Sequence, residues 1–155
     1  MAHIQIREAD IQDLTILVEF QMNMAKETED LILDETILTK GLKSVFENPE
    51  KGKFLVAFNS QNPDTILASL FIQKEWSEWR NGHMLWVHSV YVHPKFRGQK
   101  IFPQMYMHLQ GIVAENESLK GIRLYVDKRN KKAQNVYKKL KMNSEHYDLY
   151  EWTKN

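Results

Sequence analysis

The hydrophobic period of the chain changes midway along the sequence, and this change limits the fold more than any other feature. The stretch HMLWVHSVYV, residues 83–92, is rich in β-branched and aromatic residues, which is typical of a strand. Beyond it, Ile101, Met105 and Leu109 recur at the spacing of one helix face. The stretch GIRLYV, residues 121–126, returns to a strand pattern. A strand, a helix and a strand in this order usually form a right-handed parallel crossover, so we expect one here.

Further strands and helices surround this crossover. Residues 4–8 alternate like a short first strand, and two helices with apolar faces should follow them. Turn-forming residues at 59–64 separate two strand-like runs and predict a hairpin, and Asn81-Gly82 marks a second tight turn. A last helix over about residues 130–140 should precede a closing strand, SEHYDLYEW.

The predicted element order is therefore βααβββαβαβ. This order describes an α/β (α+β) fold with a mixed, mostly antiparallel central sheet flanked by helices. A chain of 155 residues is long enough for one sizeable core and short for two, so we expect a single domain over residues 1–155.

Composition and charge exclude several classes of function. The apolar fraction of 43% is ordinary for a soluble protein, and no run of about 18 apolar residues could span a bilayer. The first residues lack a secretory pattern and the chain has no cysteine, so we expect a cytoplasmic location without disulfides or a metal site. A net charge of +1 and a basic run spread around the last predicted helix argue against nucleic-acid and membrane partners.

Two segments resemble the GNAT superfamily of N-acetyltransferases. The first is a strand ending in Val92-x-Pro94, followed by Arg97, where the family pattern reads Arg or Gln, two residues, Gly, one residue, Gly or Ala. Lys100 and Phe102 stand in place of the two glycines. The resemblance covers essentially the whole chain and implies a GNAT-like fold that uses acetyl-CoA.

The second segment matches more completely. Asn130, Ala133 and Tyr137 reproduce the family spacing N-x-x-A-x-x-x-Y on a helix that follows a strand. The family's helix normally ends in glycine followed by an aromatic residue, whereas Lys141 and Met142 follow Leu140 in this chain.

The first segment has a physical reason to bind phosphates. A helix N-terminus presents unpaired main-chain N–H groups and partial positive charge, and these amides remain whatever the side chain, proline excepted. Pro103 would be tolerated in the first helical turn. The resemblance implies that the cofactor's pantetheine arm pairs with the preceding strand as an added strand. A basic strand-to-helix corner without a ligand is the alternative. The expected cofactor-binding residues are Val90, Tyr91, Val92, Arg97, Gly98, Gln99, Lys100, Ile101, Phe102, Asn130 and Tyr137.

Acetyl transfer to an amine needs a base for the amine and an acid for the departing thiolate. Tyr137 matches the family position of the acid, because a phenol of pKa about 10 stays protonated at neutral pH. His88, with an ordinary pKa of about 6.5, is the candidate base on the strand where relatives carry an acidic residue. The alternatives are a core tyrosine, a structural histidine and, for Asn130, a simple helix cap.

Carboxylates and tryptophans mark the candidate acceptor site. Glu75 and Glu78 flank Trp76 in a segment expected to form a loop beside the acceptor, where charge and cation–π attraction would hold a cationic amine. Glu27 belongs to an acidic stretch expected between the first two helices. An exposed hairpin turn and a solvated acidic loop explain the same residues without a ligand.

These residues lead to one main hypothesis and one from another class. The first is an acetyl-CoA-dependent N-acetyltransferase that transfers an acetyl group directly to a primary amine of a small, cationic acceptor. We expect direct transfer, because a chain without cysteine cannot form a cysteinyl acetyl-enzyme and other nucleophiles are less suited to forming one. The second is a catalytically impaired acyl-CoA-binding protein, a sensor or partner module with the same fold. The resemblance also leaves room for a homodimer, as is common in the family.

Overall fold

The computed structural model describes residues 3–154, which divide into two compact units on either side of Leu124 and Tyr125. The first unit contains β1 (Ile4–Glu8), α1 (Leu14–Glu29), α2 (Glu35–Glu47), β2 (Lys53–Asn59), β3 (Asn62–Ser77), β4 (Gly82–Val92), α3 (Ile101–Glu115) and β5 (Leu119–Leu124). Short 3-10 turns join these elements at Ile11–Asp13, Pro49–Lys51 and Pro94–Phe96. The second unit contains α4 (Lys131–Lys139).

One five-stranded sheet organises the first unit, in the order β1-β2-β3-β4-β5. Neighbouring strands from β1 to β4 are antiparallel, whereas β4 and β5 are parallel. The expected hairpins and the parallel β4-α3-β5 connection are therefore confirmed, as is the mixed, mostly antiparallel sheet.

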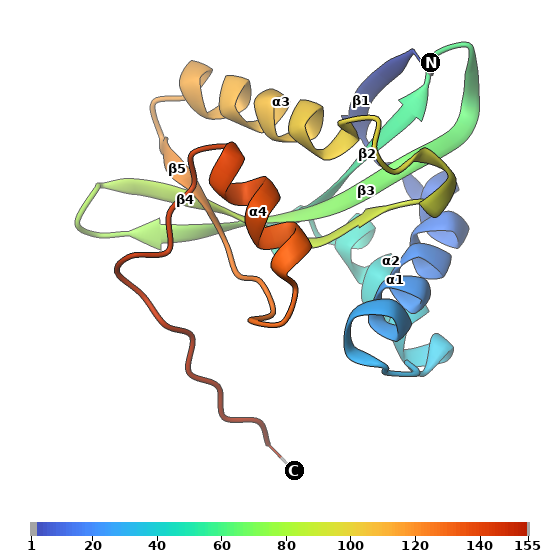
Figure 1. Ribbon diagram of the computed structural model, residues 1–155, viewed down its shortest axis with the longest axis horizontal. Helices are drawn as coiled ribbons and strands as arrows, with labels where there is room; N and C mark the ends of the chain where they lie inside the picture. Colours follow the sequence, from blue (N-terminus) through green and yellow to red (C-terminus); the bar gives the residue numbers. More distant parts are fainter. Residues whose placement is uncertain (1–2, 155) are drawn as a thin grey trace. The chain divides into compact units, whose positions relative to one another are not determined.

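Helices cover both faces of this sheet, with α1 and α2 on one face and α3 on the other (Figure 1). The core under α1 and α2 contains Phe20 from α1 together with Phe54, Val56 and Tyr91 from the sheet. The alternate strand residue Leu55 points to the opposite face and is also buried, since successive side chains of a strand alternate. The backbone of β4 is thus held between two apolar layers.

The second unit begins at Tyr125, and the N-terminus of its helix α4 carries the simple cap that the sequence left open as an alternative for Asn130. The side chain of Asn130 accepts a hydrogen bond from the Ala133 N–H at 3.0 Å. The half-buried residues of the helix lie on one stripe, as the periodicity predicts. They include Ala133, Val136, Tyr137 and Leu140.

The closing strand predicted over residues 144–152 is wrong, because this segment has no regular secondary structure. Its large side chains do not keep a period of two: Tyr147 and Leu149 share one parity, and Tyr150 and Trp152 share the other. A strand of this kind would carry apolar side chains on both faces, so it needs cover on both as well as a neighbouring strand. The observed element order ends at α4.

Candidate functional site

β4 contains an irregularity just before its C-terminal end. Ser89 has a left-handed backbone with φ 52°. The register with β3 shifts here, since Tyr91 lies opposite Ser69 whereas His88 lies opposite Phe71. An irregularity of this type bends a strand and changes the direction of the side chains that follow.

The same part of β4 has an open edge within the first unit. Its ladder with β5 ends where Val87 lies opposite Leu124, while pairing with β3 continues to Val92. In the first unit, Tyr91 and Val92 therefore pair with β3, and the ladder between β4 and β5 does not reach them. Such an edge can accept an extended ligand through main-chain hydrogen bonds, as expected for Val90, Tyr91 and Val92.

The turn between β4 and α3 keeps a glycine-like backbone although one of the family's glycines is missing. Gly98 has φ 81°, and Lys100, the residue before α3, has φ 56° and ψ 35°. Both values lie in the left-handed region that glycine adopts most readily. The first bond of the helix runs from Gln104 N to Lys100 O at 3.3 Å, so the amides before Gln104 precede the intrahelical ladder. Pro103 falls in the first turn, where proline is tolerated.

The second missing glycine has a different structural explanation. Phe102 is only 7% exposed, and its ring lies 6.3 Å from that of Tyr106. The side chain is thus part of the core around α3, while its main-chain N–H stays in the first turn of the helix. Phe102 changes the packing behind the turn without removing a donor.

Arg97 joins the turn to the end of α1. Its Nε donates to the carbonyl of Val92 at 2.9 Å, and its Nη2 donates to Glu27 at 2.7 Å. The guanidinium also lies 5.5 Å from the ring centre of Tyr91, whose hydroxyl donates to Glu27 at 3.3 Å. Burial, and then the charge of Glu27, raises the pKa of Tyr91. This network fixes the turn against α1.

Glu27 is therefore not in the inter-helix loop where the sequence predicted it. It lies in the last turn of α1, and both carboxylate oxygens accept hydrogen bonds, from Tyr91 and Arg97. Its carboxylate forms an ion pair with the guanidinium of Arg97 at 2.7 Å. Its role as an acceptor ligand stays a prediction, and its observed contacts connect α1 to the turn.

His88 lies on β4 among aromatic rings. The ring of Trp86 stacks on it at 6.0 Å between centroids, and that of Phe71 lies 6.1 Å away. Burial lowers the pKa of His88 below its ordinary value, so the imidazole is neutral at pH 7. A neutral imidazole is the form that can accept a proton.

Glu75 belongs to a polar cluster that the sequence did not predict. The residue is part of β3 rather than a loop, and it accepts hydrogen bonds from the indole of Trp86 and from Arg123 at 3.1 Å. Arg123 on β5 lies opposite Trp86 on β4. Glu75, Trp86 and Arg123 lie on three different strands, and only the strand register brings them together. The spacing of Trp86 and His88 in the sequence places these two residues on one face of β4.

Trp76 and Glu78 lie outside this cluster. Trp76 follows Glu75 in β3, so its side chain points to the opposite face, where its ring meets that of His83 at 5.1 Å. Glu78 lies in the exposed turn between β3 and β4. The loop expected here is wrong for Glu75 and Trp76, which both lie in β3, and the aromatic neighbour of Glu75 is Trp86. A role of Glu75, Trp76 and Glu78 in acceptor binding stays a prediction.

In the second unit, the half-buried Tyr137 lies on the apolar stripe of α4. Burial raises its pKa above the ordinary value of 10.0, so the hydroxyl stays protonated throughout the neutral range. Asn130 uses its side-chain oxygen to cap the helix. The cap explains why asparagine suits this position, and contact with a cofactor stays a prediction.

The end of α4 repeats the behaviour of the turn before α3. Lys141, which stands where the family has glycine, has φ 63°. Its N–H donates to Lys138 O at 3.0 Å, and that of Met142 donates to Tyr137 O at 3.1 Å. These two bonds form a Schellman motif, in which glycine is favoured after the helix cap.

Replacing Lys141 by glycine should raise the free energy of unfolding by about 1 kcal/mol, because glycine adopts the left-handed backbone without steric cost. Urea unfolding followed by far-UV circular dichroism measures the change. The matched control is Lys138→Gly within α4, where the same substitution should lower stability by about 1 kcal/mol. Equal effects at the two positions would contradict the left-handed cap.

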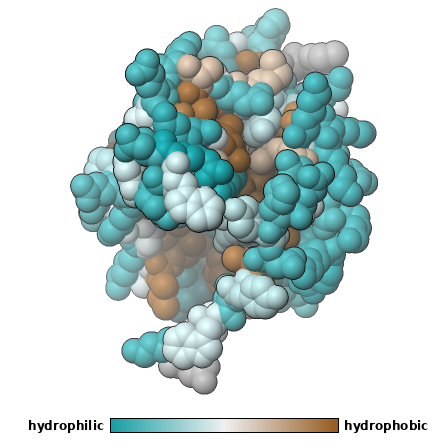
Figure 2. All heavy atoms as spheres, turned by 90° about the vertical axis from the view of Figure 1, so that its left-hand side faces the viewer, coloured by the Kyte–Doolittle hydropathy of each residue, from teal (hydrophilic) through white to brown (hydrophobic). Residues whose placement is uncertain are grey.

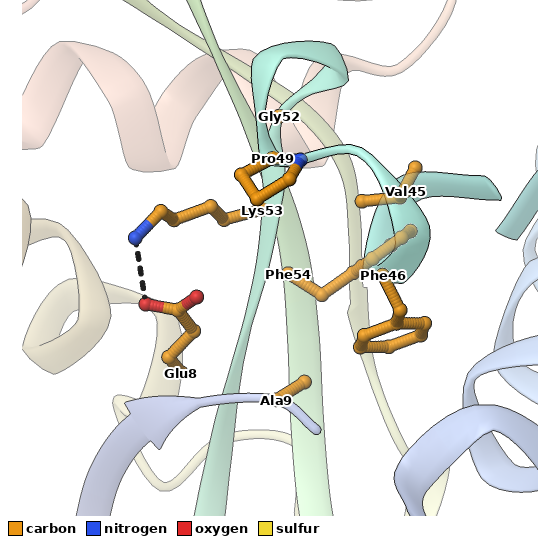
Figure 3. Close-up of a pocket in the computed structure, with 8 residues that line it drawn as sticks. All are labelled: Glu8, Ala9, Val45, Phe46, Pro49, Gly52, Lys53 and Phe54. Carbon is orange, nitrogen blue, oxygen red and sulfur yellow. Dashed lines mark hydrogen bonds and ion pairs between the residues drawn. The ribbon is translucent and has the colours of Figure 1, made fainter. Parts of the chain in front are cut away.

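Two surface hollows lie away from the β4–α3 turn. The smaller, of about 70 Å³, is lined by residues of β1, α2 and β2, including Glu8 and Lys53, which pair at 2.9 Å (Figure 3). The larger, of about 470 Å³, is lined mainly by polar residues around Asp10 and Asp64. Neither contains a residue of the turn. Among residues 3–154 no three His, Asp or Glu side chains are placed to hold a metal, and no helix is long and apolar enough to cross a membrane.

The sequence and the fold both match known acetyltransferases. The sequence model described as the acetyltransferase (GNAT) family matches residues 16–142. A crystal structure of a possible acetyltransferase from Clostridium difficile 630 is 39% identical, with a TM-score of 0.89 over 98% of each chain. No curated protein matches the sequence.

More distant structures show the same fold. A predicted acetyltransferase from Clostridium acetobutylicum, solved with acetyl-CoA, is 20% identical, with a TM-score of 0.73 over 96% of each chain. An aminoglycoside acetyltransferase from an uncultured soil metagenomic sample, solved with sisomicin, is 12% identical, with a TM-score of 0.76 over 98% of this chain and 96% of its own. The family match runs from α1 through the β4–α3 turn to the end of α4, and the chain belongs to the acetyltransferase (GNAT) family.

Proposed function

We propose that this protein is an acetyl-CoA-dependent N-acetyltransferase that acts in the cytoplasm as a single domain over residues 1–155. It transfers the acetyl group directly to a primary amine of a small, cationic acceptor. The observation that carries the proposal is the left-handed backbone of Gly98 and Lys100 before α3. This backbone leaves a turn of main-chain amides at a helix N-terminus, which is a favourable site for a pyrophosphate.

Two features of the chain fit the cofactor. The amides of residues 98–102 would hold its phosphates, with Lys100 adding positive charge, and the open edge of β4 at Val90–Val92 would hold its pantetheine arm. Arg97 supports this site by bonding to Val92 and Glu27. The bound cofactor supplies the acetyl thioester.

Two side chains of the protein then accept and donate the protons of the reaction. Neutral His88 accepts a proton from the amine, directly or through water, and Tyr137 gives its hydroxyl proton to the departing thiolate. A cysteinyl intermediate cannot form because the chain has no cysteine. We propose a single displacement, in which the amine attacks the thioester carbonyl and the thiolate departs.

The proposal also specifies that the acceptor amine belongs to a cationic molecule. Its support is the exposed carboxylate of Glu78, the acidic end of α1 and the aminoglycoside acetyltransferase among the structural neighbours. Glu75 and Glu27 each pair with an arginine, so an ammonium group would have to compete for these carboxylates. Attraction of the acceptor thus depends on the exposed Glu78 more than on Glu75 or Glu27, whereas Trp76 points to the face of β3 opposite to that of Glu75.

A catalytically impaired acyl-CoA-binding protein is the second candidate, and the buried Phe102 in place of a family glycine favours it. Titration with acetyl-CoA, free CoA and longer acyl-CoAs tests both candidates through melting temperature and the fluorescence of the four tryptophans. We expect acetyl-CoA at 100 times its Kd to stabilise the protein by about 2.7 kcal/mol. If none of these ligands has an effect, both candidates are wrong.

His88 makes a prediction about pH. Because burial lowers its pKa, the limb of kcat/KM that reports the neutral base should lie below the ordinary value of about 6.5, with activity rising as pH rises through it. His88→Gln should remove this limb. The matched control is His108→Gln on the exposed face of α3, which should leave the profile unchanged. An unchanged limb in His88→Gln would show that another group is the base.

A further inference from the structure

Glu75, towards the end of β3, forms hydrogen bonds with both oxygens of its carboxylate. Oε2 accepts from the indole N–H of Trp86 on β4, and Oε1 accepts from Nη1 of Arg123 on β5 at 3.1 Å. Trp86 lies diagonally across from Glu75, since its direct partner in the ladder is Gln73. Diagonal neighbours in a sheet are within reach of long and aromatic side chains. Glu75 thus connects three strands, and its carboxylate cannot rotate without breaking one of the two bonds.

The bond from Glu75 determines how the ring of Trp86 lies. The second side-chain torsion of a tryptophan has a broad, roughly two-fold profile, so the strand backbone alone does not fix the plane of the ring. A hydrogen bond at Nε1 selects one orientation, because this atom lies on one edge of the indole. In the selected orientation the ring makes an angle of only 10° with that of His88, with 6.0 Å between the centroids.

His88 has a second aromatic neighbour, Phe71, which is held differently. The ring of Phe71 lies 6.1 Å from that of His88 and 4.8 Å from that of Phe54, and it packs against the core under α1 and α2. Trp86, in contrast, is only half-buried and bonds to an exposed carboxylate. Core packing therefore fixes one aromatic neighbour of His88, and a polar contact fixes the other.

The charged groups on this face of the first unit form ion pairs. Glu75 from β3 pairs with Arg123 from β5, and beyond the irregularity of β4 Glu27 from α1 pairs with Arg97. The cause of the lowered pKa of His88 is burial. An aromatic ring that lies against the imidazole adds to this burial, because it keeps water away from the charged form.

We propose that Glu75, held by Arg123, is a positioning residue that fixes the ring of Trp86 against His88 and so keeps the imidazole in one orientation with little water around it. The inference rests on the proposed function only in treating His88 as the base, since the contacts themselves need no ligand. It gives Glu75 a role other than binding the acceptor, because an anchor of this kind touches no substrate.

Nuclear magnetic resonance titration of His88 tests the positioning without any reaction. The signal of its Cε1 proton is identified by its loss in His88→Gln, and its pKa is measured in the full-length protein and in two variants. Glu75→Ala removes the anchor, so water should reach the imidazole and the pKa should rise toward the ordinary value of about 6.5. Glu75→Gln keeps an oxygen that can accept from the indole N–H, so the pKa should stay near that of the parent protein.

The two variants lose the same negative charge, and this loss alone would lower the pKa of His88 in both alike. A difference between them therefore reports the hydrogen bond to Trp86. Glu78→Ala, in the exposed turn after β3, is the matched control and should leave the pKa of His88 unchanged. Figure 2 views the protein from this turn, where hydrophilic side chains predominate on the surface, so we expect the variants to stay folded, which circular dichroism checks. Equal pKa values in Glu75→Ala and Glu75→Gln would overturn the proposal.

The pH dependence of kcat/KM tests the link to the reaction. If His88 is the base, Glu75→Ala should move its limb to higher pH and lower kcat by about tenfold, and Glu75→Gln should restore both. A pKa that rises in the titration while the kinetic limb stays in place would support the anchor and show that His88 is not the base. An equal kinetic loss in both variants, without a difference in pKa, would contradict the anchor and show that the charge of Glu75 acts on the acceptor.

Discussion

Replacing Tyr137 by phenylalanine should lower kcat by about 100-fold or more and leave the affinity for acetyl-CoA nearly unchanged. The substitution removes one hydroxyl from the half-buried stripe of α4 and keeps the ring that packs there. Because burial raises the pKa of Tyr137, the wild-type side chain carries its proton over the whole neutral range. Initial rates of thiol release and a separate binding titration measure the two effects.

The matched control for this variant is Tyr106→Phe. Tyr106 lies on α3, is 7% exposed and has a pKa that burial likewise raises, but it belongs to neither matched motif. The control loses the same hydroxyl from a similar environment and should keep its kcat within about threefold. If Tyr137→Phe turns over as fast as this control, Tyr137 is not the acid.

Replacing Phe102 by alanine should lower the free energy of unfolding by about 3–5 kcal/mol, although alanine fits the family pattern at this position. The side chain is only 7% exposed and packs against Tyr106, so truncation leaves a cavity behind the turn. A loss of this size corresponds to a fall of about 10 °C in melting temperature for a chain of this length. Urea and thermal unfolding measure it.

Lys100→Gly is the comparison, since it restores the other family glycine. The left-handed backbone of Lys100 already matches what glycine adopts, so this variant should be as stable as the parent or more stable by up to about 1 kcal/mol. Opposite effects at positions 100 and 102 would show that the two departures from the motif differ physically. A loss below about 1 kcal/mol in Phe102→Ala would contradict its place in the core.

Hydrophobic period predicted most of the fold. The β-branched and aromatic run of β4 and the helical spacing of α3 predicted the parallel crossover, because both patterns are local properties of the sequence. The predicted closing strand is wrong because strand formation depends on more than the local sequence pattern. Residues 144–152 have strand-forming side chains, but a strand also needs a partner edge, and no local pattern reports whether one chain provides it.

The candidate site could be predicted where it depends on local geometry. Asn130 caps α4 and Pro103 falls in the first turn of α3, as their positions in the sequence indicate. The contacts of Glu27 with Arg97 and of Glu75 with Arg123 depend on packing and strand register between distant segments. A single sequence carries no direct signal for such pairs, so both carboxylates were expected to be available to a ligand.

The left-handed backbone of two lysines explains how the main-chain geometry of the family is retained without its glycines. Lys100 and Lys141 both adopt positive φ, at a cost of about 1–2 kcal/mol each by steric crowding of the side chain. Packing of α3 and the hydrogen bonds at the end of α4 hold these residues in place. A motif that looks half lost in the sequence is therefore retained in the main chain.

The most direct measurement of the central claim is turnover of acetyl-CoA with a panel of small amines. The full-length protein is mixed with acetyl-CoA and each amine in turn, and both the released thiol and the mass of the amine are followed. We predict thiol release that depends on the amine, with a matching gain of one acetyl group on it. Binding of acetyl-CoA without acetylation of any amine in the panel would contradict the acetyltransferase and favour the acyl-CoA-binding protein.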